Sequence, residues 1–489
     1  MTESVEAIKL SDELGPVDYL LHRGEANPRT RSGIMALELL DTTPEWAQFR
    51  NRFESASRRV LRLRQKVVVP TLPTASPRWV VDPDFNLDFH VRRVRVSEPG
   101  TLREVFDLAD LILQSPMDIS RPLWTATLVE GLADGKAATL LHVSHAVTDG
   151  VGGVQMFAEI YDLERDPPAK PTLPLPVPQD LTSNDLMRQG INHLPFAVVG
   201  GVMSALSGAV SAAGRAVLEP TATVSGIVGY AMSGMRVLNR AAEPSPLLRR
   251  RSLATRSEAI DIPLADLHKA AKAGGGSIND AYLAGLCGAL RRYHEAFGVP
   301  ISTLPMAVPV NLRAEADTAG GNRFTGVNLA APIGTVDPVS RMKKIRAQMT
   351  QRRDEPAMNI IGSLAPVLSV LPTAVLEGIT GSVIGSDVQA SNVPVYPGDT
   401  YIAGAKVLRQ YGIGPLPGVA MMVVLISRGG WCTITVRYDR AAVRNEALFA
   451  QCLLEGFDEI LALAGDPPPQ AVPASFTESA VSTRSVAGS

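Results

Sequence analysis

The amino-acid sequence predicts an α/β protein built from two α/β halves that a helical crossover joins. Each half mixes apolar runs typical of buried strands with apolar positions at helical spacing. Proline occupies six of the twelve positions from 167 to 178, which forbids a regular helix and favours extended chain between the halves. The sequence shows no repeat of fixed short period, so a solenoid is excluded.

The first half is assigned to residues 1–166. From Trp124 to Val129, apolar and mixed positions alternate as in a strand, and Ala138 to Ser144 is a nearly continuous apolar run, as in a buried strand. A helix should follow this second strand, with one face formed by four apolar positions, Val154, Phe157, Ala158 and Tyr161.

The proline-rich linker and the crossover are assigned to residues 167–258. The uncharged stretch from Leu194 to Gly214 has nearly the length needed to span a bilayer, but its glycines, serines and Pro195 argue against spanning. We interpret it as a weakly amphipathic helix, packed in the core or in contact with lipid at an interface. A second uncharged stretch, Ala357 to Leu376, predicts broken helices that could line an apolar cavity.

The second half is assigned to residues 259–465, and residues 466–489 to a disordered tail rich in Pro, Ser and Ala. Met306–Leu312 and Val327–Ile333 have the composition of strands. Two further apolar runs, Val419–Ser427 and Cys432–Tyr438, flank Arg428, Gly429 and Gly430 and predict a hairpin.

Composition excludes several classes of protein. The 489 residues carry a formal net charge of −2, which lacks the basic excess of a nucleic-acid-binding protein. The three cysteines are far apart, and the histidines are scattered, so neither a disulfide framework nor a metal site is expected. The N-terminus has no basic region followed by an apolar run, so we expect no secretory signal and a cytoplasmic protein.

His145 is the first candidate for chemistry, because it follows a buried strand and precedes a Gly-rich turn. A partly desolvated imidazole can accept a proton from an alcohol near neutral pH. Asp149, four residues later, could orient the imidazole, or it could simply cap the following helix. A structural histidine at the strand end is the alternative, since geometry rather than spacing decides a general base.

Several short motifs occur in order along the chain. They are the opening LSDELGPVDYLL, the block DFNLDFHVRRVRV at 84–96, Pro122, Leu123 and Trp124 (PLW), the segment SHAVTDG at 144–150, Asn279 and Asp280 (ND), and Asn392, Val393 and Pro394 (NVP). Together they resemble the motifs of the bacterial wax ester synthase/diacylglycerol acyltransferase family, part of the CoA-dependent acyltransferase superfamily, in which SHAVTDG corresponds to HHxxxDG.

This resemblance implies two chloramphenicol-acetyltransferase-like halves with the active-site channel between them. It also implies transfer of a long acyl chain from acyl-CoA, as substrate and without a cofactor, to diacylglycerol or to a long-chain alcohol. His145 would be the general base, with Asp149 and Asn279 as further catalytic residues. Ser144, Gly150, Asp280 and the PLW and NVP residues would line the substrate channel.

One residue departs from the family pattern, since Ser144 stands where the family has its first histidine. Alternation along a strand points Ser144 away from the face of His145, so it should not replace the base. The absence of a GxSxG segment argues against a serine hydrolase. The departure leaves open a non-catalytic lipid-binding homologue, beside the triacylglycerol-forming enzyme and the wax ester synthase.

The remaining candidate residues have structural alternatives. Ser277 and Asp280 have the spacing of a capping box at a helix start, where the Asn279 amide could hydrogen-bond an oxyanion or simply meet solvent. Trp124 is expected first as a core aromatic residue and second as channel wall. Residues 392–394 form a turn by default. Peripheral contact with the inner membrane or with lipid inclusions is a further expectation.

Overall fold

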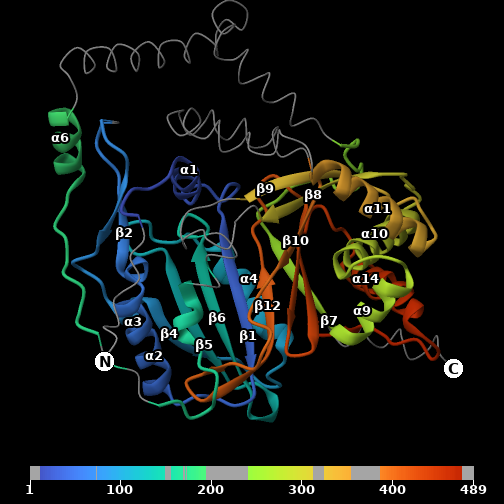
Figure 1. The fold of residues 1–489 in the computed structure, drawn as a ribbon, viewed down its shortest axis with the longest axis horizontal. Helices are drawn as coiled ribbons and strands as arrows, with labels where there is room; N and C mark the ends of the chain where they lie inside the picture. Colours follow the sequence, from blue (N-terminus) through green and yellow to red (C-terminus); the bar gives the residue numbers. More distant parts are fainter. Residues whose placement is uncertain are drawn as a thin grey trace, which may run out of the picture.

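The computed structural model describes residues 11–72, 74–148, 153, 156–168, 171, 173–193, 241–311, 324–353 and 386–475. Two large β-sheets lie side by side in this part of the chain (Figure 1). The smaller of these has six strands in the order β11-β12-β1-β6-β5-β4, and the larger has seven in the order β15-β7-β14-β13-β10-β8-β9. Strands β2 and β3 form a separate two-stranded sheet. The architecture is therefore a mixed α/β fold of two halves, as predicted. The elements that precede the linker are α1 (Pro16–Gly24), β1 (Gly33–Leu40), α2 (Trp46–Arg59), β2 (Gln65–Val68), β3 (Arg78–Val81), α3 (Leu87–His90), β4 (Val91–Arg95), α4 (Leu102–Gln114), β5 (Trp124–Glu130) and β6 (Ala137–Ser144).

The second half supplies most strands of the larger sheet and a layer of helices. Its elements are β7 (Thr255–Pro263), α9 (Leu264–Ala273), α10 (Ile278–Ala296), β8 (Leu304–Asn311), β9 (Phe324–Ala331), α11 (Pro338–Arg353), β10 (Val388–Val393), β11 (Tyr401–Ile402), β12 (Ala405–Ile413), β13 (Met421–Arg428), β14 (Trp431–Asp439), α14 (Glu446–Leu461) and β15 (Val472–Pro473). The predicted strands thus correspond to β5, β6, β8, β9, β13 and β14.

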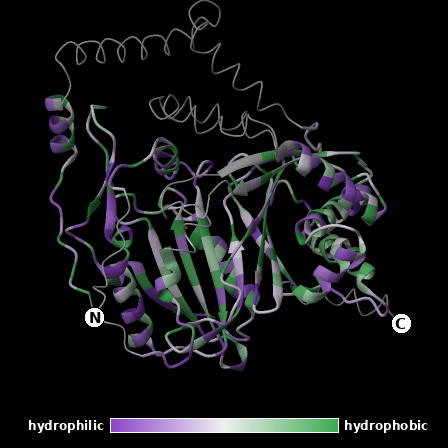
Figure 2. Ribbon diagram, viewed as in Figure 1, coloured by the Kyte–Doolittle hydropathy of each residue, from purple (hydrophilic) through white to green (hydrophobic). Residues whose placement is uncertain are grey.

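The smaller sheet is buried on both faces because apolar residues occupy successive positions of its central strand β6. Leu141 and Val143 face a core that includes α2, whereas Ala138 and Leu140 face a second core that includes α4. All eight residues of β6 are buried. This explains why the segment reads as a continuous apolar run rather than an alternating one. Hydrophobic residues follow the strands of both sheets (Figure 2).

The larger sheet uses strand alternation to separate a core from a cavity wall. Met421, Val423 and Leu425 of β13 pack in the core formed with helices α9, α10 and α14. Met422, Val424 and Ile426 lie on the opposite face and form a separate apolar cluster. Because successive side chains of a strand point to opposite faces, one strand serves both environments.

Two local signals in the sequence produce the expected turns. Ser277 caps α10 and forms a reciprocal capping box with Asp280, with oxygen–nitrogen distances of 3.2 and 2.8 Å. Gly429 and Gly430, between β13 and β14, have φ values of +54° and +78°. Glycine tolerates this left-handed backbone without strain, which allows the tight hairpin.

The two halves are interwoven, so the predicted boundary at residue 259 does not separate two independent sheets. β12 pairs with β1 in the smaller sheet, although it lies within the segment assigned to the second half. β7 begins at Thr255, four residues before that boundary. Helix α4 also joins the halves, because Asp110 accepts hydrogen bonds from the Ser257 backbone nitrogen and hydroxyl, both at 2.7 Å.

The described part of the linker is extended and packed against the first half. The backbone nitrogen of Gln179 donates to Val81 O (3.1 Å), and Arg58 Nη1 donates to Leu173 O (3.0 Å). Helix α6 (Ser183–His193) follows and buries Leu186 against β2 and β3. The predictions for Leu194–Gly214 and Ala357–Leu376 lie outside the described residues. Among the described helices, none combines the length and the apolar composition needed to cross a membrane.

The prediction of a disordered tail from residue 466 is wrong for its first ten residues. Val472 and Pro473 form β15, which pairs with β7 at the edge of the larger sheet. Ser475 is buried, and its hydroxyl accepts a hydrogen bond from Ala259 N at 2.7 Å. Composition predicted disorder here because the segment has few apolar residues of its own. An exposed sheet edge can nevertheless order such a segment through backbone hydrogen bonds.

Candidate active site

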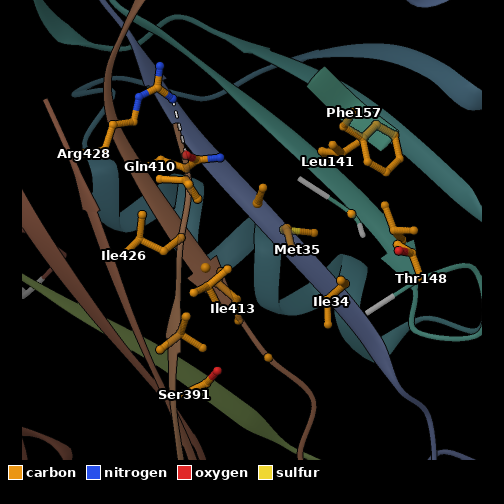
Figure 3. A pocket seen from close by; sticks show the side chains of 18 of the residues that line it. Ile34, Met35, Leu141, Thr148, Phe157, Ser391, Gln410, Ile413, Ile426 and Arg428 are labelled. Atoms are coloured by element: carbon orange, nitrogen blue, oxygen red, sulfur yellow. Dashed lines mark hydrogen bonds between the residues drawn. The ribbon is translucent and has the colours of Figure 1, made fainter. Parts of the chain in front are cut away.

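A cavity of about 430 Å³ lies between the two sheets and draws its walls from both halves. Its volume is within the range typical of small-molecule sites. Figure 3 shows β1 running along it. Most of the walls are apolar. The first half contributes Ile34, Met35, Ala36, Leu141, Val143, Phe157, Ala158 and Leu163 to them, and the second half contributes Val393, Val395, Ile413, Met422, Val424 and Ile426.

His145 lies on the wall of this cavity, in the turn directly after β6. Its side chain is half-buried, and its backbone nitrogen donates to Ser32 O at 3.2 Å. Within the described residues it is the one histidine that lines the cavity. Leu141, Val143 and His145 all line it, so the alternation of β6 continues into the turn and aims the imidazole at the cavity.

Ser144 is absent from the lining of the described cavity, so its assignment to the substrate channel is not supported there. As strand alternation predicts, it points away from the face of His145, and it holds the turn that carries His145. Its hydroxyl donates to Glu25 Oε1 at 2.7 Å and accepts a hydrogen bond from Ala146 N at 3.2 Å. The same Glu25 oxygen accepts from the Ser32 hydroxyl at 3.0 Å. Ser32, Glu25 and Ser144 are all buried, so these charge-assisted hydrogen bonds are strong. The role of Glu25 was not predicted from the sequence, because nothing in its local pattern links it to residue 144.

The rest of the SHAVTDG segment is only partly described. Asp149 and Gly150 lie outside the described residues, so the proposed pairing of Asp149 with His145 stays a prediction. Thr148 is buried and lines the cavity beside His145. The predicted helix face after β6 is present in part, since Phe157, Ala158 and Tyr161 all line the cavity and Ala158–Ile160 form a short 3-10 helix.

The residues of the PLW motif lie in the core of the first half rather than on the cavity wall. Trp124 is buried, and its indole nitrogen donates to Leu63 O at 2.7 Å. Its ring stacks on His90 with a centroid distance of 4.8 Å. Pro122 and Leu123 are buried and also do not belong to the cavity lining of the described residues. The expectation of a core aromatic is confirmed, and the described cavity does not use these three residues as channel wall.

The two motifs of the second half have different positions relative to the cavity. Val393, at the end of β10, lines it, whereas its exposed neighbours Asn392 and Pro394 do not. Asn279 and Asp280 lie in the first turn of α10, in the helix layer on the far face of the larger sheet, and are absent from the lining of the described cavity. Asp280 is the capping-box partner of Ser277, whose backbone nitrogen donates to its carboxylate. An oxyanion role for Asn279 stays a prediction.

One end of the cavity is polar, and it was not predicted from the sequence. Tyr161, Thr400, Gln410 and Arg428 line this end, and the side chain of Glu38 lies behind them. The Tyr161 hydroxyl and Gln410 Nε2 both hydrogen-bond Glu38 Oε1, the latter at 3.1 Å. Burial raises the pKa of Glu38 to about 7, opposed by the Tyr161 hydrogen bond and the charge of Arg428. These residues come from distant parts of the chain, and Arg428 was assigned only to a hairpin.

Solved structures of other proteins share this fold. A wax ester synthase/diacylglycerol acyltransferase from Marinobacter aquaeolei VT8 superposes with a TM-score of 0.63 over 93% of this chain and 100% of its own, at 20% identity. A condensation domain of the CDA synthetase gives a TM-score of 0.52 over 93% of this chain and 98% of its own, at 14% identity. At these identities the likeness shows the fold alone.

The sequence comparisons then give the family. The wax ester synthase/diacylglycerol acyltransferase catalytic domain matches residues 8–282, and the C-terminal domain of the same family matches residues 320–461. The chain belongs to this family and is an enzyme of the acyltransferase class. A protein of Mycobacterium tuberculosis (strain H37Rv), provisionally named a diacylglycerol O-acyltransferase, is 85% identical over the full length of both chains. Another from the same strain is 28% identical over 86% of this chain and 89% of its own.

Proposed function

We propose that the protein transfers a long-chain acyl group from acyl-CoA to the free hydroxyl of diacylglycerol, forming triacylglycerol, with His145 as the general base. The observation that carries the proposal is the position of His145 on the wall of an apolar cavity shared by the two halves. The name of the relative with 85% identity supports the choice of diacylglycerol as acceptor.

The proposed reaction is a direct transfer in which no acyl-enzyme forms. The imidazole of His145 removes the acceptor's hydroxyl proton as the oxygen attacks the thioester carbonyl carbon. The tetrahedral intermediate then collapses, the carbon–sulfur bond breaks, and His145 returns the proton to the leaving CoA thiolate. A positioned base of this kind contributes about 10²- to 10⁴-fold in rate. Acyl-CoA is a substrate here, and the reaction needs no cofactor.

The surroundings of His145 favour this role. The apolar walls exclude water, so the reacting carbonyl is shielded from hydrolysis, and each buried methylene of a lipid chain contributes about 0.8 kcal/mol to binding. The hydrogen bonds among Ser32, Glu25 and Ser144 fix the backbone on both sides of His145. In this proposal Ser144 is a positioning residue, and the loss of the family's first histidine leaves the base in place.

The acceptor is a membrane lipid, so the cavity must open toward a lipid surface. Leu163 and Tyr396 both line the cavity, yet they are 69% and 53% exposed, which places them at its rim. We propose that this rim makes peripheral contact with the inner membrane or with lipid inclusions. Sedimentation with anionic liposomes tests it. Leu163→Ser should reduce binding, whereas Leu111→Ser, at an equally exposed position on α4, should not.

The activity test offers labelled palmitoyl-CoA to the purified full-length protein with diacylglycerol and hexadecanol in parallel tubes. Triacylglycerol as the main product supports the proposal. Ester formed only with hexadecanol makes the protein a wax ester synthase instead. If folded protein binds palmitoyl-CoA but forms ester with neither acceptor, the protein is a non-catalytic lipid-binding homologue. Reversion of Ser144 to His would then be the first variant to make.

A further inference from the structure

The polar end of the cavity contains a buried cation, Arg428, that forms no salt bridge within the described residues. Arg428 is 8% exposed and lines the cavity. Its Nη1 donates to Gln410 Oε1 at 3.3 Å, and its Nη2 hydrogen-bonds the Thr400 hydroxyl (Figure 3 shows the contact with Gln410). Within the described residues Arg428 makes no ion pair, whereas the buried guanidinium groups of Arg103 and Arg341 both pair with carboxylates.

A second polar group at this end also has unused hydrogen-bonding capacity. Glu38 is fully buried, and its Oε1 accepts hydrogen bonds from Tyr161 and Gln410. Its other oxygen, Oε2, has no hydrogen-bond partner within the described part of the chain. Burying an unpaired guanidinium and an unsatisfied carboxyl oxygen is costly, and such groups in a cavity are the usual means of orienting a ligand.

The register of β1 gives the distance along the cavity from Glu38, at the polar end, to the end that holds His145. Gly33 pairs with Ser144, and the His145 backbone bonds to Ser32, so this end of β1 lies level with His145. Glu38 pairs with Gln410 at the other end. Five residues of strand at about 3.3 Å each give about 16 Å. Carbon–carbon bonds of about 1.5 Å, tilted to the chain axis, advance somewhat more than 1 Å each, so about a dozen carbons cover this distance.

The wall between the two ends is apolar, as Figure 3 shows for Met35, Ile413 and Ile426. An unsubstituted chain of about a dozen carbons with its reacting group at His145 would therefore place a methyl end against Arg428. A chain with an oxygen at that point would instead give the guanidinium an acceptor. Hydrogen bonds to charged groups are among the stronger ones in proteins.

We propose that Arg428, Gln410, Glu38 and Tyr161 form a polar subsite that binds an oxygen-bearing group, a hydroxyl or a carbonyl, carried about a dozen carbons from the reacting group of a substrate chain. This inference rests on the proposed function only for the identity of the reacting group. The chain that occupies the cavity is either the acyl donor or the acceptor, and the subsite selects the same chemistry in both.

Direct binding tests the subsite independently of turnover. We would measure the affinity of dodecan-1-ol and dodecane-1,12-diol by displacement of a fluorescent fatty alcohol, with the wild type and with His145→Ala. Without a polar subsite the diol should bind more weakly, because its second hydroxyl must leave water. The proposal predicts that the diol binds at least tenfold more tightly in both proteins. If the diol binds no better than the mono-alcohol, the proposal is overturned, and the polar end of the cavity is then a surface that binds water rather than a substrate group.

Two variants separate recognition from packing. Arg428→Met should remove the preference for the diol, and Arg428→Lys should keep part of it. Val424→Ala, in the apolar wall, should weaken both ligands equally and leave their ratio unchanged. If Arg428→Met fails to fold, Thr400→Val removes a hydroxyl that bonds the guanidinium and should reduce the preference. A preference that survives in both variants would contradict the assignment.

Turnover then identifies the chain that uses the subsite. We would compare KM for 12-hydroxydodecanoyl-CoA with that for dodecanoyl-CoA, and KM for the diol with that for dodecan-1-ol. A KM at least tenfold lower for the hydroxylated acyl-CoA assigns the subsite to the donor, and the same difference for the diol assigns it to the acceptor. Turnover with equal KM values in both pairs overturns the proposal. An absence of turnover with intact diol binding refutes only the proposed function.

Discussion

Replacing Glu38 with glutamine should change the pH dependence of stability, because this carboxyl is buried inside the polar end of the cavity. Burial raises its pKa from 4.5 to about 7. In the unfolded chain the group ionises near 4.5, whereas in the folded protein it keeps its proton up to about 7. Its contribution to stability is therefore fully present below pH 4.5 and is lost as the pH rises through 7.

The size of the effect follows from this shift. The interval from 4.5 to about 7 is about 2.5 pH units. At about 1.4 kcal/mol per unit, the wild type loses about 3 kcal/mol of stability that Glu38→Gln does not lose. Glutamine keeps the size and the acceptor oxygen for Tyr161, so the variant isolates ionisation from packing. Other titrating groups act on both proteins and cancel in the difference.

Urea unfolding between about pH 5 and pH 8 measures this difference. The free energy of unfolding of Glu38→Gln, relative to wild type, should rise by about 2.5 kcal/mol across this range, since part of the difference is already present at pH 5. Glu243→Gln, at an exposed position, serves as the control and should follow the wild type within about 0.5 kcal/mol. Parallel curves for Glu38→Gln and the wild type would refute the reasoning about this buried carboxyl.

Three further predictions concern the first half of the chain. Ser144→Ala should lower kcat by about 10- to 100-fold with little change in KM, because the turn that carries His145 loses two hydrogen bonds, and an unchanged kcat would refute the positioning role. Gly33→Ala should destabilise the fold by about 1–3 kcal/mol in urea unfolding, because the new Cβ would lie 2.6 Å from His142 Nε2, and a neutral result would contradict the close packing. Burial lowers the pKa of His22 and His90 to about 4 and that of His142 to about 3. The three neutral imidazoles therefore make their full contribution to the free energy of unfolding above pH 6.5. This contribution is lost as the pH falls below 6.5, by up to about 4 kcal/mol per pH unit for the three together. Proton uptake on unfolding at about pH 5, measured by calorimetry, should approach three from these groups, and an uptake near zero would contradict their neutral burial.

Local sequence patterns predicted the parts of the fold that depend on neighbours in the chain. The β6 strand, the β13–β14 hairpin and the capping box at Ser277 each depend on a few adjacent residues, and all three are present. The position of Trp124 in the core was also predictable from its place at a strand start. The placement of His145 on the cavity wall follows from alternation along β6.

Pairings between distant segments were not predictable from a single sequence. The strand β12 joins the first sheet by backbone hydrogen bonds to β1, which leave no mark in its side-chain pattern. Residues 472–473 became an edge strand for the same reason. The polar end of the cavity collects Glu38, Gln410 and Arg428 from three strands, and none of them stands in a motif. In the NVP segment, alternation leaves only Val393 on the cavity wall.

The most direct test of the account is single-turnover transfer from labelled palmitoyl-CoA to diacylglycerol by the wild type and by His145→Ala. His268→Ala is the matched control, since His268 is exposed on α9. We predict that His145→Ala lowers the rate by about 10²- to 10⁴-fold while palmitoyl-CoA still binds and the melting temperature stays near that of the wild type, and that His268→Ala matches the wild type. A His145→Ala protein that transfers the acyl chain at the wild-type rate would contradict the assignment of His145 as the general base.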